Sequence, residues 1–150
     1  MPQSLSKVLL HVVFSTKNRE KIIPSRLRSA LHGYLAGTCR ARGSEAFRVG
    51  GTDDHVHIAC TLPRTVTMAK LVEEIKKPSS IWMKQQEGGS RQFSWQSGYG
   101  IFSLGQSQLP ILLQYIDNQE EHHRMKSFKE ELLELLEKYG VDYDEKYLWD

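Results

Sequence analysis

Apolar residues recur with two different periods along the chain, and the change from one to the other predicts the order of strands and helices. Residues 8–14 form a continuous apolar run, rich in β-branched and aromatic side chains, that is typical of a buried strand. Over residues 24–42 the apolar positions recur every three to four residues, which predicts a helix with Ser25 as its N-cap. Strands are expected next at 46–49 and 55–62, because the segment between them is rich in glycine and aspartate and suits a hairpin loop.

The second half of the chain predicts another helix, an irregular strand and a third helix. The helix at 67–86 contains Pro78, which lacks a backbone donor, so we expect a kink or a break at Lys77. An irregular fourth strand is expected within 93–104, where β-prone residues surround two glycines. Leucines and an isoleucine at helical spacing predict one continuous helix over 107–123.

The last helix has clear boundaries in the sequence. Ser127 and Glu130 form a capping box, a stripe of leucines follows, and Gly140 ends the helix. The order βαββαβ followed by two helices predicts an α+β fold, a ferredoxin-like sandwich with an antiparallel sheet and a C-terminal helical extension. We divide one domain, residues 1–150, into a ferredoxin-like core (1–105), a helix that carries Tyr115 (106–126), and a C-terminal helix with an acidic tail (127–150).

Composition narrows the class of protein. The chain has 150 residues, and its 39% hydrophobic content supports a real core, which excludes the disordered and collagen-like classes. The 20 Lys and Arg nearly balance the 18 Asp and Glu, but they are unevenly distributed. Residues 1–64 carry 10 basic and 4 acidic side chains, whereas residues 127–150 carry 3 and 8. The basic first part is therefore a candidate surface for a polyanion.

Cysteine spacing and the first apolar run indicate the compartment. Cys39 and Cys60 form no CxxC pair, which excludes a disulfide scaffold and a four-cysteine zinc site and favours free thiols in a reducing cytoplasm. The apolar run at 8–14 is interrupted by His11 and followed by basic residues, so it matches neither a signal peptide nor a membrane-spanning helix. We expect a cytoplasmic protein without membrane contact.

Two pairs of side chains can carry chemistry. His55 and His57 are two residues apart on a predicted strand, so both imidazoles point to the same face. Tyr115 and Gln119 are four residues apart on a predicted helix and share one side of it. Either pair also arises by chance, as structural histidines or as a half-buried tyrosine. Together, two imidazoles and an amide oxygen can hold a divalent cation beside a phenol that can act as a nucleophile.

Five segments of the chain carry a family resemblance: FSTKNR (14–19), HVH (55–57), WQSGYG (95–100), YIDNQEEHH (115–123) and KYLWD (146–150). Together they resemble the single-tyrosine HUH transposases of bacterial insertion sequences and their relatives associated with repetitive extragenic palindromes. The resemblance implies a metal-dependent enzyme that cleaves and rejoins single-stranded DNA at hairpin-bearing ends. It implies a 5′-phosphotyrosine intermediate and a free 3′-hydroxyl.

The resemblance also implies a role for each matching residue. His55 and His57 match the metal-binding histidine pair, Tyr115 matches the nucleophile, and Gln119 matches the third metal ligand. It further implies a homodimer, in which the tyrosine helix of one subunit can complete the metal site of the other. Pro78 departs from the family's pattern, where a plain helix residue is expected.

The ligand set and the basic residues lead to expectations for the metal cofactor and for the DNA contacts. A mixed nitrogen and oxygen ligand set should accept Mg²⁺ as the physiological ion and Mn²⁺ in its place, while Zn²⁺ can occupy the site without supporting turnover. The candidate DNA-binding side chains are the basic residues that follow the first strand and begin the first helix. They are Lys17, Arg19, Lys21, Arg26 and Arg28.

Several aromatic and histidine side chains have a structural and a functional interpretation. Trp82, Trp95 and Tyr99 can stack on unpaired bases, but for each of them core packing is the stronger expectation. His122 and His123 are expected simply to lie near a helix C-terminus, where cations are favourable.

Two other functions remain open from the sequence. A ferredoxin-like nucleic-acid-binding module without chemistry would use the histidines structurally and would bind DNA without a covalent adduct. A Zn²⁺-dependent hydrolase would use water in place of Tyr115 and would cleave DNA without any covalent species.

Overall fold

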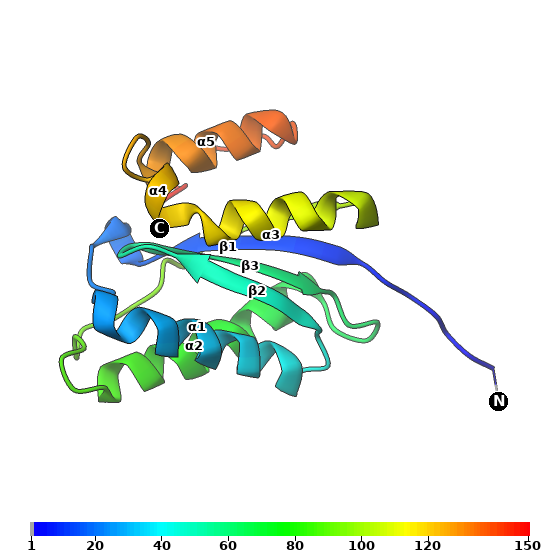
Figure 1. Ribbon diagram of the computed structural model, residues 1–150, viewed down its shortest axis with the longest axis horizontal. Coiled ribbons are helices and arrows are strands. Elements are labelled where there is room, and N and C mark those ends of the chain that lie inside the picture. Colours follow the sequence, from blue (N-terminus) through cyan, green and yellow to red (C-terminus); the bar gives the residue numbers. More distant parts are fainter. Residues whose placement is uncertain (1) are drawn as a thin grey trace.

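The computed structural model describes residues 2–150 and shows one four-stranded antiparallel sheet with helices on both faces (Figure 1). The strand order is β2-β3-β1-β4, which confirms the predicted ferredoxin-like α+β fold with its C-terminal helical extension. The elements are β1 (Leu9–Ser15), η1 (Lys17–Arg19), α1 (Ser25–Ala41), β2 (Ala46–Gly51), β3 (His55–Thr61), α2 (Met68–Gln85), β4 (Gly100–Leu104), η2 (Gln106–Gln108), α3 (Leu109–Asp117), α4 (Gln119–His122) and α5 (Phe128–Lys138).

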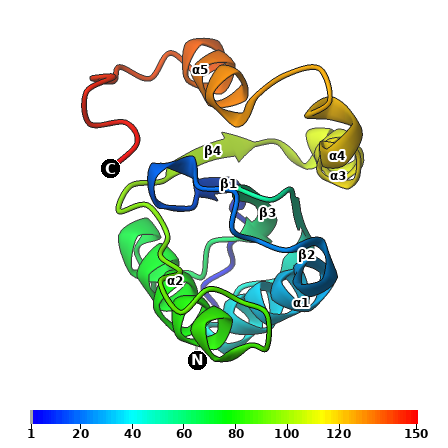
Figure 2. The same cartoon turned by 90° about the vertical axis from the view of Figure 1, so that its left-hand side faces the viewer.

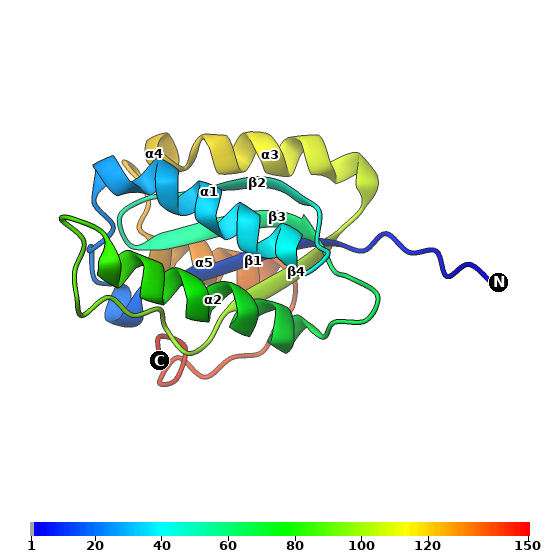
Figure 3. The same ribbon diagram turned by 90° about the horizontal axis from the view of Figure 1, so that it is seen from below.

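The two faces of the sheet bury different sets of helices. Helices α1 and α2 cover one face, as the view from below shows (Figure 3), while α3, α4 and α5 lie over the other (Figure 2). Along β3, Val56, Ile58 and Cys60 join the main core under α1 and α2. His55 and His57 point the opposite way, as predicted from the two-residue period, into the layer of α3 to α5.

The layer that covers the histidines consists of two apolar clusters with a polar gap between them. In one cluster α5 packs Phe128, Leu132 and Leu136 against the residues of β1 and β4. In the other, α3 packs Leu109 and Ile116 over β1 and β3. Because apolar side chains fill both flanks, polar groups in the gap are shielded from water, which strengthens their electrostatic interactions.

Gly50 at the end of β2 sets the position of α3. A Cβ atom at this residue would lie 2.6 Å from Cγ2 of Ile116 and 2.7 Å from its carbonyl oxygen. Glycine is therefore required so that the backbone of α3 can rest directly on the sheet. The neighbouring residue on α3 is Tyr115, so this close approach also determines the height of that side chain above the sheet.

Helix α2 runs through Pro78 as one continuous element, so the break that was one of the two outcomes predicted at Lys77 does not occur. The hydroxyl group of Ser79 donates a hydrogen bond of 2.7 Å to the carbonyl of Ile75 and accepts one of 2.9 Å from the indole of Trp95. The buried face of α2 against the sheet outweighs the hydrogen bond that the proline removes.

Three other local expectations are corrected. Pro24, not Ser25, is the N-cap residue of α1, and it makes no side-chain capping bond. The fourth strand begins only at Gly100, because the chain before it bends to bury Phe93 and Trp95 in the main core. The predicted continuous helix over 107–123 divides at Asn118, whose φ of −97° and ψ of 17° separate α3 from α4.

The two cysteines are free, as predicted, and the structure buries both of them. Within residues 2–150, no helix combines the length and the apolar character that crossing a bilayer requires.

Candidate active site

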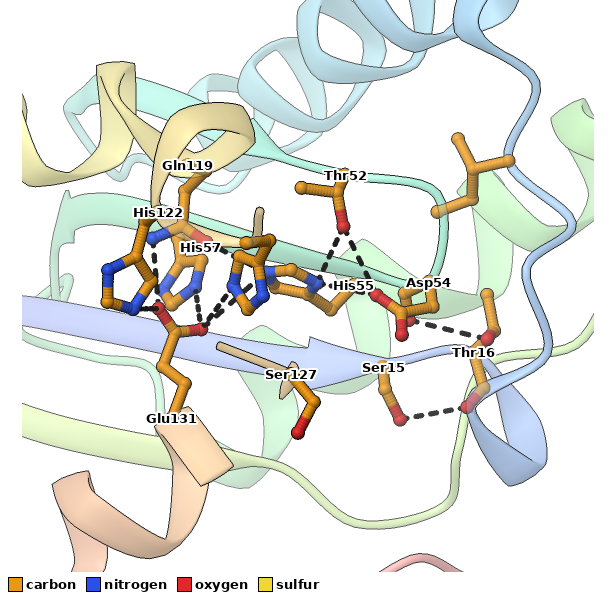
Figure 4. A network of polar contacts seen from close by, with 12 residues as sticks. Ser15, Thr16, Thr52, Asp54, His55, His57, Gln119, His122, Ser127 and Glu131 are labelled. Atoms are coloured by element: carbon orange, nitrogen blue, oxygen red, sulfur yellow. Dashed lines mark hydrogen bonds and ion pairs between the residues drawn. The ribbon is translucent and has the colours of Figure 1, made fainter. Parts of the chain in front are cut away.

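Three separate elements bring polar side chains into the gap between α3 and α5. Strand β3 contributes His55 and His57, α4 begins with Gln119, and the first turn of α5 contributes Glu131. Figure 4 shows that these side chains point toward one another from the sheet and from the two helices. All four are 2% exposed or less.

The carboxylate of Glu131 lies at the centre of the cluster. Its Oε1 atom is 2.9 Å from Nε2 of His57, 3.1 Å from Nε2 of His123 and 3.6 Å from Nε2 of His55. Burial by itself would raise the pKa of this carboxyl, but the hydrogen bonds from His123 and His57 outweigh burial and lower it well below the usual range. Glu131 is therefore an anion surrounded by imidazole nitrogens.

The side chain of Gln119 links the histidines to that carboxylate. Its Oε1 atom lies 2.8 Å from Nε2 of His55, and its amide nitrogen donates a hydrogen bond of 3.0 Å to Oε2 of Glu131. The break at Asn118 turns the start of α4 toward the sheet, so that this glutamine is buried. The predicted grouping of His55, His57 and Gln119 is thus present as a spatial cluster.

The phenol of Tyr115 reaches the same cluster from α3. Its hydroxyl group donates a hydrogen bond to Oε2 of Glu131, and its ring packs edge-on against His57 with the ring centroids 5.6 Å apart. Burial and the adjacent carboxylate both raise the pKa of this phenol, because each disfavours the phenolate. In this arrangement Tyr115 is held as a neutral donor.

Each strand histidine has a partner on its second ring nitrogen. Nδ1 of His55 lies 2.7 Å from the carboxylate of Asp54 and 3.1 Å from the hydroxyl group of Thr52. Nδ1 of His57 lies 2.7 Å from Nε2 of His11 on β1. Such partners orient an imidazole and fix which nitrogen faces a metal ion.

Burial controls the charge of the histidine pair that spans β1 and β3. It lowers the pKa of His11 to about 3 and also lowers that of His57, so both rings are neutral near pH 7. The pKa of Asp54 is lowered as well, because its hydrogen bond to His55 outweighs the opposing effect of burial. The neutral form of imidazole is the one that binds metal ions.

The donor set suits a divalent cation. His55, His57, His123 and Glu131 each offer one ligand atom, and these four atoms lie within 4.8 Å of one another. The amide oxygen of Gln119 adds a further oxygen donor at their edge. Imidazole nitrogens combined with carboxylate and amide oxygens are typical of sites for borderline divalent ions.

Sequence reasoning missed Glu131 and gave His123 only a structural role. Glu131 lies on the buried side of α5 with Phe128 and Leu132, and a carboxylate at such a position is costly unless it is paired. That placement on an apolar stripe was the available signal. His122 and His123 lie at the end of α4, as predicted, but both also approach this carboxylate, with Nε2 of His122 3.3 Å from Oε2 and Nε2 of His123 3.1 Å from Oε1.

Two of the five predicted DNA-binding residues lie beside the cluster. Lys21 and Arg28 line a hollow of about 280 Å³ that also includes Thr52, Asp54 and His123. The other three lie in different surroundings. Lys17 is exposed on η1, the guanidinium of Arg19 packs over the ring of Trp149, and Arg26 donates a hydrogen bond to the carbonyl of Glu87.

The aromatic residues that were candidates for base stacking differ in exposure. Trp95 belongs to the main core, and Trp82 is half-buried and stacks on Tyr34. Tyr99 is 41% exposed, which leaves it the most accessible of the three.

Comparison with known proteins agrees with this geometry. Residues 4–119 match the protein family described as "Transposase IS200 like". The transposases for insertion sequence element IS200 of Salmonella typhimurium and of Salmonella typhi are each 25% identical to this chain over 121 residues, which is 77% of this chain and 78% of the relative.

Two solved structures share the fold. A Deinococcus radiodurans protein described as a candidate transposase has a TM-score of 0.60 and 20% identity, covering 79% of this chain and 98% of its own. A structure of a REP-associated tyrosine transposase bound to a REP hairpin has a TM-score of 0.60 and 17% identity, covering 82% and 73%. Since the family's sequence pattern extends from ahead of β1 to the first residue of α4, this protein is a member of the IS200-like transposase family.

Proposed function

We propose that this protein is a divalent-metal-dependent transposase that cleaves and rejoins single-stranded DNA at hairpin-bearing ends, with Tyr115 as the nucleophile. The observation that carries the proposal is that the Tyr115 hydroxyl and the donor atoms of His55, His57 and Gln119 meet in one buried cluster of a single chain. Family membership supports the activity. The related structure with a REP hairpin supports a hairpin as the DNA partner.

His55, His57 and Gln119 are the proposed metal ligands, and Glu131 offers an additional carboxylate oxygen. When bound, a divalent cation polarises the scissile phosphate and offsets the charge that grows on it. We propose Mg²⁺ as the physiological ion, with Mn²⁺ able to substitute. Asp54 and His11 hold the two strand histidines so that their Nε2 atoms face the cluster.

In the proposed reaction the Tyr115 oxygen forms a bond to phosphorus while the bond from phosphorus to the 3′ oxygen breaks. The products are a 5′-phosphotyrosine and a free 3′-hydroxyl, and the leaving 3′ oxygen gains the proton. Glu131 Oε2 accepts the hydrogen bond from the tyrosine hydroxyl and so orients it, but its lowered pKa makes this carboxylate a weak proton acceptor. Attack by a second 3′-hydroxyl on the phosphotyrosine reverses the step and joins new ends without another energy source.

The proposed path of the DNA leads over the hollow beside the cluster. Lys21 supplies positive charge there, whereas the guanidinium of Arg28 is paired with the carboxylate of Glu120 at 2.9 Å. Lys17 adds a further exposed positive charge on η1. Phosphate contacts of this type position a strand without reading its sequence.

The homodimer stays a prediction. Tyr115 lies beside His57 of its own chain, so one subunit contains both halves of the site. Exchange between subunits would require the segment after Gly105 to swing away from the sheet. Mixing inactive Tyr115→Phe protein with inactive His55→Ala protein distinguishes the two arrangements, because activity returns only if subunits share a site.

The central test is formation of a covalent adduct. Full-length protein is incubated with a labelled hairpin oligonucleotide and Mg²⁺ or Mn²⁺, and the products are separated under denaturing conditions. We expect a protein–DNA adduct that is lost with a chelator and in the Tyr115→Phe variant. Tyr34→Phe is the matched control, since that tyrosine stacks on Trp82 away from the cluster.

The same assay separates the other functions. Tight hairpin binding without an adduct in either ion would indicate a binding module. Cleavage that persists in Tyr115→Phe without any covalent species would indicate a hydrolase and would exclude Tyr115 as the nucleophile.

A further inference from the structure

We infer that His11 on β1 is a positioning residue that fixes the imidazole of His57 for metal binding. The inference rests on the proposed function, because it concerns one of the proposed ligands. His11 lies outside the pairs His55/His57 and Tyr115/Gln119 that the sequence singled out, and it is not itself among the grouped metal donors.

The contact between the two rings is direct and shielded. Nε2 of His11 lies 2.7 Å from Nδ1 of His57, and the rings stack with an angle of 25° and a centroid separation of 5.0 Å. His11 is 4% exposed and His57 is fully buried. In the sheet register Val13 lies opposite His57, so His11, two residues earlier on β1, points to the same face.

The two proposed ligand histidines therefore have different outer partners. Nδ1 of His55 faces the carboxylate of Asp54, which is the usual arrangement for a metal-binding histidine. Nδ1 of His57 instead faces another imidazole. A carboxylate can only accept a hydrogen bond when ionised, whereas a neutral imidazole donates through one nitrogen and accepts through the other.

This difference allows His57 to exchange partners without turning its ring. In the present arrangement Nε2 of His57 lies 2.9 Å from the carboxylate of Glu131 and donates to it, so Nδ1 accepts from His11. A metal ion binds the lone pair of Nε2 only when His57 carries its single proton on Nδ1 instead, with His11 carrying its own proton on its Nδ1 atom. His11 then accepts that proton's hydrogen bond, and the contact between the rings is kept in both tautomers.

His11 also contacts the ring of the proposed nucleophile. Its ring packs edge-on against Tyr115, with the ring centroids 6.2 Å apart, and lies 6.1 Å from Phe102 on β4. It therefore touches the ring of a proposed ligand on one side and that of the proposed nucleophile on another.

Metal affinity of the His11 variants tests the inference. Metal-depleted wild type, His11→Phe and His11→Gln are titrated with Mn²⁺ by calorimetry. Removing an outer hydrogen-bond partner typically weakens metal binding about 10- to 100-fold, so this loss is expected for His11→Phe. His11→Gln retains a donor and an acceptor and should bind close to the wild-type affinity. Phe102→Leu is the packing control and should also bind normally.

A spectroscopic signature separates positioning from a merely structural role. Histidine ring nitrogens of the Zn²⁺-loaded wild type are assigned by NMR, and His57 should carry its proton on Nδ1 in a hydrogen bond. That signal should persist in His11→Gln and disappear in His11→Phe. Circular dichroism verifies that each variant is folded. If a variant does not fold, the NMR spectrum of the Zn²⁺-loaded wild type still tests the inference.

The outcomes distinguish the inference from the proposed function. If the wild type binds neither Mn²⁺ nor Zn²⁺, the proposed metal site fails and the inference fails with it. If the wild type binds and His11→Phe binds as tightly, or if His57 of the Zn²⁺-loaded wild type lacks a proton on Nδ1, only the inference is overturned.

Discussion

The hydroxyl group of Tyr115 donates a hydrogen bond to the carboxylate of Glu131, and this contact joins the candidate nucleophile to the metal donors through one side chain. Glu131 lies on α5, beyond the residues that match the family. The helix is held in place by its Ser127 capping box and by Phe128, which stacks on His55 with the ring centroids 4.4 Å apart. The C-terminal helix is therefore part of the site and not only a cover for the sheet.

Replacing Glu131 with glutamine should lower the pKa of Tyr115, because the carboxylate that disfavours the phenolate is removed. Titration of phenolate absorbance measures the change, with the Tyr115→Phe protein as the reference for the remaining tyrosines. Glu137→Gln removes the same charge from the exposed side of the same helix, outside the capping box, and should leave the Tyr115 pKa unaltered. If the pKa of Tyr115 is the same in Glu131→Gln and in the wild type, the carboxylate of Glu131 does not disfavour the phenolate.

Asp54→Asn should weaken Mn²⁺ binding about 10- to 100-fold, since the carboxylate that orients Nδ1 of His55 becomes a neutral amide. Calorimetric titration of the metal-depleted protein gives the affinity. Asp53→Asn is the matched control, because the contact of Asp53 with Ile23 is made by its backbone carbonyl. An equal loss of Mn²⁺ affinity in both variants would indicate a general effect of removing a negative charge, and not a specific role for the hydrogen bond between Asp54 and His55.

Gly50→Ala should reduce the free energy of unfolding by about 1–3 kcal/mol, because the new Cβ overlaps Ile116 and displaces α3. Chemical denaturation measures the loss, and the adduct assay should show reduced activity because Tyr115 moves with α3. Gly37→Ala on α1 has open space around its Cβ and should instead be neutral or stabilise by up to about 1 kcal/mol. A neutral Gly50→Ala would show that α3 is not held by this contact.

Acidification should destabilise the metal-free protein below pH 6.5. Burial lowers the pKa of His11 to about 3, that of His32 to about 4 and also that of His57, from an unfolded value of 6.5. The unfolded chain therefore binds more protons below pH 6.5, and each group costs up to about 1.4 kcal/mol of stability per pH unit there. His123, whose pKa is raised by its bond to Glu131 despite burial, contributes stability that is lost only above this range.

Denaturation midpoints measured from pH 7 to pH 4.5 test this dependence. The free energy of unfolding should fall less steeply with decreasing pH in His11→Gln than in the wild type. Glutamine does not titrate, so the contribution of one buried histidine is absent. Glu131 does not complicate the comparison, since its lowered pKa makes its contribution fall only below about pH 4.5. Parallel slopes for the two proteins would show that His11 is not held neutral by burial.

Lys21→Ala should weaken hairpin binding and reduce the salt dependence of the binding constant by about one counterion, because one phosphate contact is lost. Binding isotherms at several salt concentrations measure both effects. Lys84→Ala removes an exposed charge on α2, across the sheet from the cluster, and should change neither. Identical salt slopes for Lys21→Ala and wild type would exclude this surface as the DNA path.

The sequence by itself determined the features that depend on neighbours along the chain. The two-residue period of β3 placed His55 and His57 on one face, and Ser127 marked the start of α5. These follow from local spacing, because the geometry of a strand or a helix turn decides which side chains share a face. The ferredoxin-like order of elements was predictable for the same reason.

The tertiary structure alone decided which faces meet. Nothing near His57 in the sequence indicates that His11 or Glu131 would face its two ring nitrogens, because both contacts join residues more than 40 positions apart. The uninterrupted path of α2 through Pro78 and the break of the tyrosine helix at Asn118 were likewise set by packing against the sheet. Helix propensities differ by up to about 0.7 kcal/mol for ordinary residues and by about 3 kcal/mol for proline, and burial of a whole helix face outweighs these differences.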